Sequence, residues 1–387
     1  MTLFKKTIYL IRHGEIQSDG KRCIGITDVP LSEFGKTQAG RLGMWMARQL
    51  LHDPKPFHIY SSPIQRCLDT AGAMAKRRLS GSGSVQVCDD FHEVNMGEWE
   101  NMRFSDIKMR YPKTYQKRGE NFWDFKAPGG ESFQEAGKRF IDGLREIALL
   151  PNAGNTEEIC FVVAHVGVIR SALAYLGEID PDRIMETMIP YASVTQLNTD
   201  VSDGNVNFDV RFIGSTPTAV PNDDEITELL DRYQVPAHIR RHMKGVANMV
   251  LDIAGILDPD GSIYDRELLY AAAMLHDFAR IDRYHSTIGA LKLRGEGYEL
   301  VADIISEHDS LSLHKELSIR YKNQYYPSVE DLLYYADKRV LEETVVSLDE
   351  RFASSRFKCR TPEARMNHQR RYEKAVRIEQ DVFRSDQ

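Results

Sequence analysis

The chain has 387 residues, of which 42% are hydrophobic and 28% are charged, as in an ordinary soluble globular protein. This length is more than one hydrophobic core usually supports, so two domains are expected. The formal net charge of −7 argues against general nucleic-acid affinity, although a local basic pocket could still bind a phosphate.

Up to about residue 215, short apolar stretches alternate with helical patterns. Strands are predicted at 7–11, 57–62 and 158–165, and helices at 31–51, 63–79 and 167–177. Two further strands, at 194–198 and 207–214, are candidates for pairing with each other. This alternation predicts a largely parallel sheet covered on both faces, an α/β three-layer doubly wound domain over residues 1–215.

The pattern changes at "STPTAVPNDDE", where prolines and acidic residues mark a linker. Helices are then predicted at 225–233, 237–257, 266–281, 287–295, 299–308 and 329–348. An all-α second domain is therefore expected over residues 222–387. Its tail from Arg351 onward is basic and polar and is predicted to be a solvated helix.

The five cysteines are widely scattered and form no CxxC pair. This argues against a disulfide framework and a thiolate metal site, and it favours a reducing cytoplasm. Neither a signal peptide nor a membrane span is recognisable. The sequence thus predicts a cytoplasmic protein without membrane or nucleic-acid partners, and leaves formation of a homo-oligomer open.

Four polar residues in the first half follow predicted strands. His13 and His165 each come just after an apolar strand, Arg12 precedes His13, and Arg66 lies in the first turn of a helix after a third strand. Because ligands of open α/β sheets bind outside the carboxyl ends of the strands, these side chains are expected to meet at one edge.

This set of residue types suits phosphate chemistry. Arginine neutralises a phosphate dianion with forked donors, and a neutral imidazole can attack phosphorus and form a covalent intermediate. A second histidine can hold the equatorial oxygens, and a carboxylic acid is needed to protonate the leaving group. The stretch "FHEVNMGEWE" offers Glu93, Glu98 and Glu100 for that role. No metal or cofactor is required in this domain.

Six segments form an ordered set in the first half: "LIRHGE", "GITDVPLSEFGKTQA", "IYSSPIQRCLDTA", "HEVNMGEWE", "PGGESFQEAGKRF" and "VVAHVGVIR". Over about residues 5–200 they resemble the histidine phosphatase (phosphoglycerate-mutase-like) superfamily, nearest to its α-ribazole-phosphatase type. The resemblance implies that His13 is the phosphorylated nucleophile and Glu93 the proton donor. It further implies a phosphate pocket of Arg12, Arg66 and His165, with Gly14 letting the backbone close on the phosphate.

Two positions depart from the family's usual pattern. Val166 follows the second histidine where glycine or alanine is common, and Asn101 follows "GEWE" where glycine is usual. Both bear on the substrate more than on the chemistry. Because mutases typically carry a longer insertion near the acid, a phosphatase is favoured. Glu98 and Glu100 are expected to be structural or solvated, and Arg170 to lie on a helix surface.

The second half places histidines and aspartates within otherwise apolar helices, in "RRHMKGVANMV", "AAAMLHDF", "RYHSTIGA", "IISEHDS" and "LYYADKRV". Burying such groups is costly unless they are paired or bind a metal, and imidazole with carboxylate suits Fe, Mn, Ni or Zn. Four of the residues would hold one ion, and two more allow a second ion with Asp277 bridging. The candidate ligands are His242, His276, Asp277 and Asp337, followed by His285 and His308.

This ordered set resembles the HD-domain metal-dependent phosphohydrolases over about residues 225–345. Its pattern is nearest to the six-ligand, two-metal members of that family. Two neighbouring ions can clamp a phosphate and make hydroxide at neutral pH. His285 and Asp309 have a plain alternative as polar loop residues, Arg280 and Lys338 are candidate phosphate contacts, and His238 and His314 are expected at the surface.

Together the two halves predict a bifunctional phosphohydrolase that acts on small-molecule phosphoesters or nucleotides. Two alternatives remain at this stage. The first is a phosphoglycerate-type mutase with a regulatory tail. The second is a phosphatase controlled by a helical domain that binds metal or nucleotide without turnover.

Overall fold

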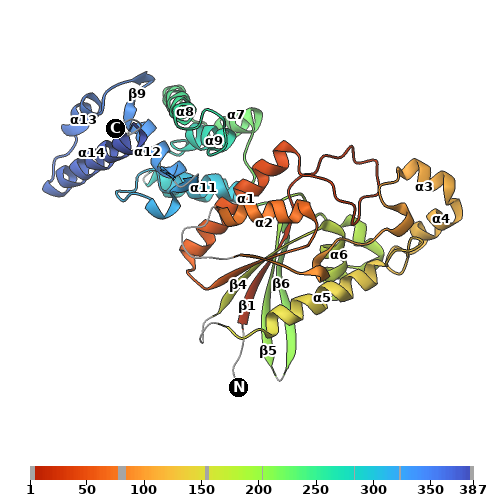
Figure 1. Ribbon diagram of the computed structural model, residues 1–387. Helices are drawn as coiled ribbons and strands as arrows, with labels where there is room; N and C mark the ends of the chain where they lie inside the picture. Colours follow the sequence, from red (N-terminus) through yellow and green to blue (C-terminus); the bar gives the residue numbers. More distant parts are fainter. Residues whose placement is uncertain are drawn as a thin grey trace. The chain divides into compact units, whose positions relative to one another are not determined.

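The computed structural model describes residues 5–76, 84–152, 157–202, 204–282, 284–321 and 324–383. The chain separates into two compact units, Met1–Thr216 and Pro217–Gln387 (Figure 1). The first unit is an α/β domain, and the second is helical.

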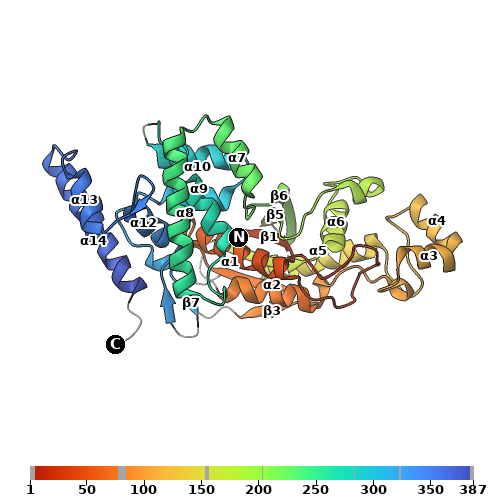
Figure 2. The ribbon, with the colours of Figure 1, turned by 90° about the horizontal axis from the view of Figure 1, so that it is seen from above.

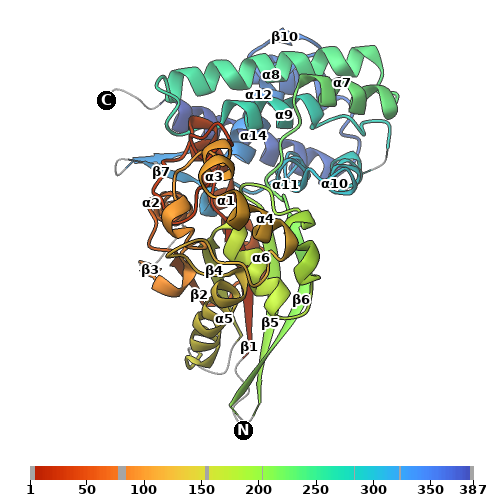
Figure 3. The same ribbon diagram turned by 90° about the vertical axis from the view of Figure 1, so that its right-hand side faces the viewer.

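A six-stranded sheet in the order β3-β2-β4-β1-β5-β6 forms the centre of the first unit. The strands β3, β2, β4 and β1 run parallel, whereas β5 is antiparallel to both β1 and β6. Figure 3 shows β5 and β6 as a long hairpin beside β1. The short edge strand β3 is absent from the sequence-based prediction. The strands are β1 (Lys5–Arg12), β2 (Phe57–Ser61), β3 (Val85–Val87), β4 (Glu158–Ala164), β5 (Val194–Ser202) and β6 (Asn205–Ser215).

Helices cover both faces of this sheet. In the fully buried β4, Cys160, Val162 and Ala164 share a core with α5 (Phe133–Leu149) and α6 (Val166–Tyr175). The alternate residues Ile159, Phe161 and Val163 pack with α1 (Glu33–His52) and α2 (Gln65–Lys76). Because successive side chains of a strand point to opposite faces, one apolar run supplies both cores. The predicted three-layer doubly wound architecture is confirmed.

Short helices fill the connections of the first unit. They are η1 (Asp89–Phe91), η2 (Gly97–Trp99), α3 (Phe104–Arg110), α4 (Pro112–Glu120) and η3 (Pro181–Glu186).

The second unit is built almost entirely from helices. They are α7 (Asp223–Arg232), α8 (Ala237–Leu257), α9 (Arg266–Leu275), α10 (His285–Gly295), α11 (Glu299–Ser306), η4 (Lys315–Leu317), α12 (Val329–Arg339), α13 (Leu348–Arg356) and α14 (Pro362–Val382). Two short ribbons accompany them, β7 (Ile319–Tyr321) with β8 (Gln324–Tyr326) and β9 (Val340–Leu341) with β10 (Thr344–Val345).

Three predicted helices of this unit are too long. Those expected to reach residues 281 and 308 end at Leu275 and Ser306, and the one expected to reach 348 ends at Arg339. After Arg339 the chain, rich in β-branched residues, forms a hairpin. It turns at Glu342, whose φ of +56° lies in the left-handed region. β-Branched residues favour extended backbone, which explains the early end of that helix.

The prediction of a solvated tail helix is wrong for one face of α14. Lys374, Ala375 and Ile378 are buried there, and the hydroxyl of Tyr334 on α12 donates a hydrogen bond to the carbonyl of Arg371 (2.8 Å). Figure 2 shows α14 beside α13 in this packing. Among the described residues, no helix is long and apolar enough to cross a membrane.

Candidate active sites

The sheet brings His13 and His165 together. They directly follow β1 and β4, which are parallel neighbours with Arg12 opposite Ala164. Their ring centroids lie 5.1 Å apart. Arg66, in the first turn of α2, reaches the same edge because β2 is the other neighbour of β4.

Arg66 bridges the two imidazoles. Its side chain is 1% exposed, and its Nε–H points at His13 Nε2 (3.3 Å) and His165 Nδ1 (3.1 Å). Its Nη atoms donate to the carbonyls of Thr27 and Gly25, each at 2.7 Å. The guanidinium is therefore fixed in orientation before any substrate arrives.

The hydrogen bonds define the tautomers of both histidines. His13 Nδ1 lies 2.7 Å from the carbonyl oxygen of Gly14, so Nδ1 carries the proton and Nε2 keeps its lone pair. His165 accepts from Arg66 at Nδ1, and its Nε2–H faces Ser62 Oγ (2.7 Å). Burial, and then the charge of Arg66, hold the pKa of both imidazoles well below their ordinary value. Both rings are thus neutral at pH 7, as a nucleophilic imidazole must be.

The side chain of Arg12 has one N–H group that is available to a ligand. Its Nη1 donates to the carbonyl of Ile189 (2.7 Å), and its Cζ lies 3.7 Å from the ring centroid of Tyr191. Within the described part of the chain, its buried Nε makes no hydrogen bond. An unpaired buried guanidinium N–H is costly and suits an anionic ligand.

Glu93 lies against the start of α6, the helix that follows His165. Its buried carboxylate accepts N–H groups from Val94 (2.9 Å), Gly167 (3.0 Å) and Val168 (2.8 Å). A Cβ on Gly167 would lie 2.6 Å from the carboxylate, so only glycine permits this approach. The arrangement places a carboxyl group one helix turn from His165.

Gly14 has a packing role in the structure. A Cβ there would meet the carbonyl oxygen of Gly35 at 2.3 Å, and its N–H donates to Thr70 Oγ1 (3.2 Å). Glycine thus lets the loop after β1 pass close to α1.

Glu100 organises the loop that Arg66 contacts. Its carboxylate accepts N–H groups from Gly25, Ile26 and Thr27 at 3.2, 2.9 and 3.0 Å, a structural role. The next residue, Asn101, has φ +58°. Asparagine tolerates this left-handed conformation better than most residues, which explains how it can stand where glycine is usual.

Sequence reasoning missed two neighbours of this site. Tyr191 lies 5.7 Å from His13 between ring centroids and stacks on Arg12. Arg170, expected on a helix surface, is half-buried and donates from Nε to the carbonyl of Thr187 (2.8 Å). No motif marks Tyr191, whereas the closeness of Arg170 to His165 was a usable signal.

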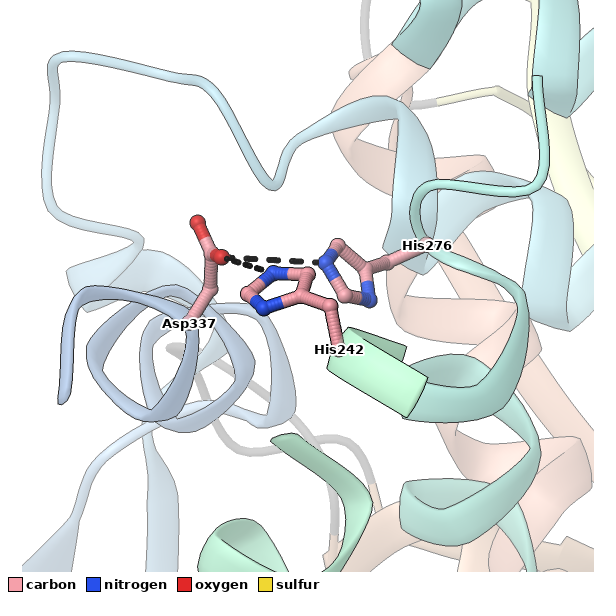
Figure 4. A group of neighbouring side chains, drawn as sticks. All are labelled: His242, His276 and Asp337. Carbon is pink, nitrogen blue, oxygen red and sulfur yellow. Dashed lines mark hydrogen bonds and ion pairs between the residues drawn. The ribbon is translucent and has the colours of Figure 1, made fainter. Parts of the chain in front are cut away.

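In the second unit, one group that could hold a metal ion consists of His242, His276 and Asp337. They come from α8, the end of α9 and α12. Asp337 Oδ1 lies 3.0 Å from His242 Nε2 and 3.8 Å from His276 Nε2 (Figure 4). The three ligand atoms converge on one point.

A second group consists of Asp277, His285 and His308. Asp277 Oδ1 lies 3.2 Å from His285 Nε2 and 3.5 Å from His308 Nε2. The other oxygen, Oδ2, lies 3.7 Å from His276 Nε2. One carboxylate therefore faces both groups, an arrangement that suits a bridging ligand.

Carbonyl groups at helix ends orient two of these histidines in a way that suits metal binding. His276 Nδ1 donates to the carbonyl of Ala273 (2.8 Å), and His308 Nδ1 donates to that of Ile305 (2.7 Å). Both carbonyls lie in the last turn of a helix, where the regular i to i+4 hydrogen bonds end. The Nε2 atoms of both rings are buried and form no hydrogen bond within the described ranges. An imidazole fixed by its other nitrogen is the usual metal-ligand arrangement, so these residues fit a divalent ion.

The acidic ligands are charged and carry cations nearby. Although burial opposes it, the imidazoles of His276, His285 and His308 hold the pKa of Asp277 well below its ordinary value. Burial likewise opposes the lowered pKa of Asp337, which Lys338 and His242 produce. Arg280 Nη1 lies 3.1 Å from Asp277 Oδ1, and Lys338 Nζ bonds Asp337. Both cations stand beside candidate ligand carboxylates, where a bound metal ion could replace them.

The α/β unit with its histidine–arginine cup and the helical unit with its histidine–aspartate groups each match a known protein family. The family model of the histidine phosphatase superfamily (branch 1) matches residues 8–208, and the chain belongs to this superfamily. The HD domain model matches residues 239–348. HD domains are generally metal-dependent, in agreement with the two groups described above.

Curated relatives match mainly the first unit. The 6-phosphofructo-2-kinase/fructose-2,6-bisphosphatase of Gallus gallus is 26% identical over 192 residues, which are 50% of this chain and 37% of that protein. Phosphoglycerate mutase-like protein 4 of Arabidopsis thaliana is 31% identical over 166 residues, 42% of this chain and 68% of that protein. The chain thus spans well under half the length of the first relative.

Among solved structures, a mycobacterial glucosyl-3-phosphoglycerate phosphatase is 25% identical. The match covers 54% of this chain and 99% of that one, with a TM-score of 0.46.

Proposed function

We propose that the protein is a bifunctional phosphohydrolase. Its first unit would cleave a phosphomonoester through a phosphohistidine, and its second unit would hydrolyse a nucleotide or another small phosphoester with bound metal. The observation that carries the first activity is the cup formed by His13, Arg66 and His165, next to the unpaired Nε–H of Arg12.

In the first step, Nε2 of His13 attacks phosphorus with its lone pair, and the ester P–O bond breaks. Glu93 donates the proton that the leaving oxygen needs. Arg12 and Arg66 hold the equatorial oxygens, where negative charge spreads in the transition state, and His165 completes the phosphate pocket. Water, deprotonated by Glu93, then attacks the phosphohistidine and releases phosphate and the free imidazole.

In the second unit, His242, His276 and Asp337 would hold one divalent ion, and Asp277, His285 and His308 a second. Iron, manganese, nickel and zinc all suit this donor set. Such ions, when bound, lower the pKa of water and polarise a phosphoryl oxygen. Arg280 and Lys338 would move from the ligand carboxylates to the substrate phosphate.

Separate substitutions and a chelator test the two activities on the full chain. His13→Ala should abolish hydrolysis of phosphomonoesters such as p-nitrophenyl phosphate and leave metal-dependent hydrolysis intact. Asp277→Ala should do the reverse, and chelation should remove only the second activity. A single substitution that silences both activities, or chelator-sensitive turnover at His13, would contradict the two-site proposal.

The names of the relatives motivate one alternative, a phosphate-transferring mutase. It predicts an isomerised phosphoester in place of free phosphate, so analysis of the product distinguishes the two. The second alternative is an HD unit that binds metal or nucleotide as a regulator. It predicts metal binding without hydrolysis of any nucleotide or phosphoester, and a change in the His13-dependent rate on adding nucleotide.

A further inference from the structure

Two His-Asp dipeptides in the second unit have the same local geometry. His276-Asp277 follows the end of α9, and His308-Asp309 lies just beyond the end of α11. Each histidine donates its Nδ1–H to the carbonyl three residues earlier and leaves a buried Nε2 without a hydrogen bond among the described residues. The ring of His308 is therefore oriented in the same way as the ring of His276, with Nε2 left for a ligand.

Both aspartates reach the same histidine. Asp277 Oδ1 lies 3.2 Å from His285 Nε2, and Asp309 Oδ2 lies 3.3 Å from that atom. Asp309 Oδ2 also lies 3.8 Å from His308 Nε2. The side chain of Asp309 is 34% exposed, against 5% for Asp277. Asp309 thus approaches the second metal group from the solvent side.

We propose that Asp309 is a further metal ligand, which binds the second ion together with Asp277, His285 and His308. Atoms bound about 2.0–2.2 Å from one ion lie roughly 2.8–3.6 Å from their neighbours in octahedral or tetrahedral geometry. The four nitrogen–oxygen separations above run from 3.2 to 3.8 Å. The inference rests on the proposed metal-dependent function of this unit.

The buried Nε2 of His308 supports the proposal independently of the positions of Asp277 and Asp309. At 1% exposure it has no hydrogen bond in the described part of the chain, yet both carboxylates stand around it. An ion there would satisfy the nitrogen and both oxygens at once. Arg280 Nη1 lies 3.2 Å from His285 Nε2 and 3.1 Å from Asp277 Oδ1, where its charge partly balances that carboxylate.

Binding of Mn²⁺ to the full, metal-stripped chain tests this ligand. The free Mn²⁺ signal in electron paramagnetic resonance gives stoichiometry and affinity without an activity assay. Wild type should bind two ions. Asp309→Asn should weaken the second ion at least tenfold and leave the first unchanged, while Asp309→His, which keeps a ligand atom, should recover much of that loss. Asp282→Asn, which removes a nearby carboxylate paired with Lys292, should match wild type.

The outcomes separate the ligand from the function. Two ions bound with wild-type affinity in Asp309→Asn would overturn the assignment of Asp309 and leave the proposed function standing. A wild-type chain that binds no Mn²⁺, nor Zn²⁺ in a parallel titration, would overturn both, and one that binds a single ion would overturn the second site. Equal unfolding temperatures of the metal-free variants would show that a lost ion reflects a lost ligand.

Discussion

Arg66 Nε lies 3.3 Å from Nε2 of His13, the nitrogen proposed to attack phosphorus. Without substrate, the lone pair of the nucleophile thus accepts a hydrogen bond from the residue proposed to bind phosphate. An entering phosphate oxygen can accept this N–H and free the lone pair while the Nη atoms of Arg66 stay on the carbonyls of Thr27 and Gly25. The same arginine therefore protects the neutral nucleophile and exposes it when the anion arrives.

Arg66→Lys should lower kcat/KM for p-nitrophenyl phosphate by about 10²–10³-fold, the usual effect of losing a transition-state donor. Lysine keeps the charge but lacks the fork that bonds Thr27, Gly25 and both imidazoles at once. Steady-state kinetics check this, and Arg145→Lys, at an exposed pair with Asp142, serves as control. A loss below threefold would contradict the role of Arg66.

Tyr191→Ala should weaken competitive inhibition by inorganic phosphate about tenfold, and Tyr191→Phe should leave it nearly unchanged. The reason is that the ring face, 3.7 Å from Arg12 Cζ, keeps the guanidinium plane in place. A double-mutant cycle with Arg12→Ala measures the coupling. Additive effects of the two alanine variants would show that Tyr191 acts independently of Arg12.

Tyr191 also illustrates what the sequence did not disclose. It lies in a turn closed by the N–H of Ser193 and the carbonyl of Pro190 (3.2 Å), in which the buried Ala192 adopts φ +56°. A left-handed alanine is strained and is not predictable from local propensity. His13, Arg66 and His165 were identifiable because each follows a strand or starts a helix of a regular α/β alternation.

The second unit shows the same contrast. Six metal-ligand candidates stood out as polar residues in apolar helices, but the helix ends before His276 and His308 were missed. Those ends orient the rings through carbonyls of the last helical turn, where the regular i to i+4 hydrogen bonds end. His314 was expected at the surface and is 6% exposed. It pairs with Asp331, which also pairs with Lys374 of α14, a helix distant in sequence.

His314 should make the stability of the second unit depend on pH. Burial lowers its pKa, but hydrogen bonds with Asp331 and Glu307 outweigh burial and raise it to about 9. Lys374 is the nearby cation. Because the folded-state pKa exceeds the unfolded value near 6.5, the stabilisation is complete below pH 6.5 and is lost as pH rises through about 9.

The measurement is the difference in free energy of unfolding between wild type and His314→Gln, obtained for the full chain. This difference should shrink by roughly 1–3 kcal/mol between pH 6.5 and pH 9.5. Taking the difference removes the contribution of the titrating groups that do not interact with His314. A difference that stays constant with pH would mean that His314 has an ordinary pKa in the folded chain.

Lys374→Met should destabilise the second unit by about 3 kcal/mol, since breaking a buried ion pair leaves the partner's charge uncompensated. Lys374 Nζ is buried 3.3 Å from Asp331 Oδ1 and 3.1 Å from the carbonyl of Ser310. In the Lys374→Met variant, Asp331 still pairs with His314 at 3.2 Å. The expected loss of stability therefore lies at the low end of the range usual for a broken buried ion pair. Denaturant unfolding measures it, with exposed Lys358→Met as control. Adding Asp331→Asn to Lys374→Met should recover part of the lost stability, because the uncompensated charge is then gone. If the double variant instead loses the full sum of the two single losses, Lys374 and Asp331 act separately.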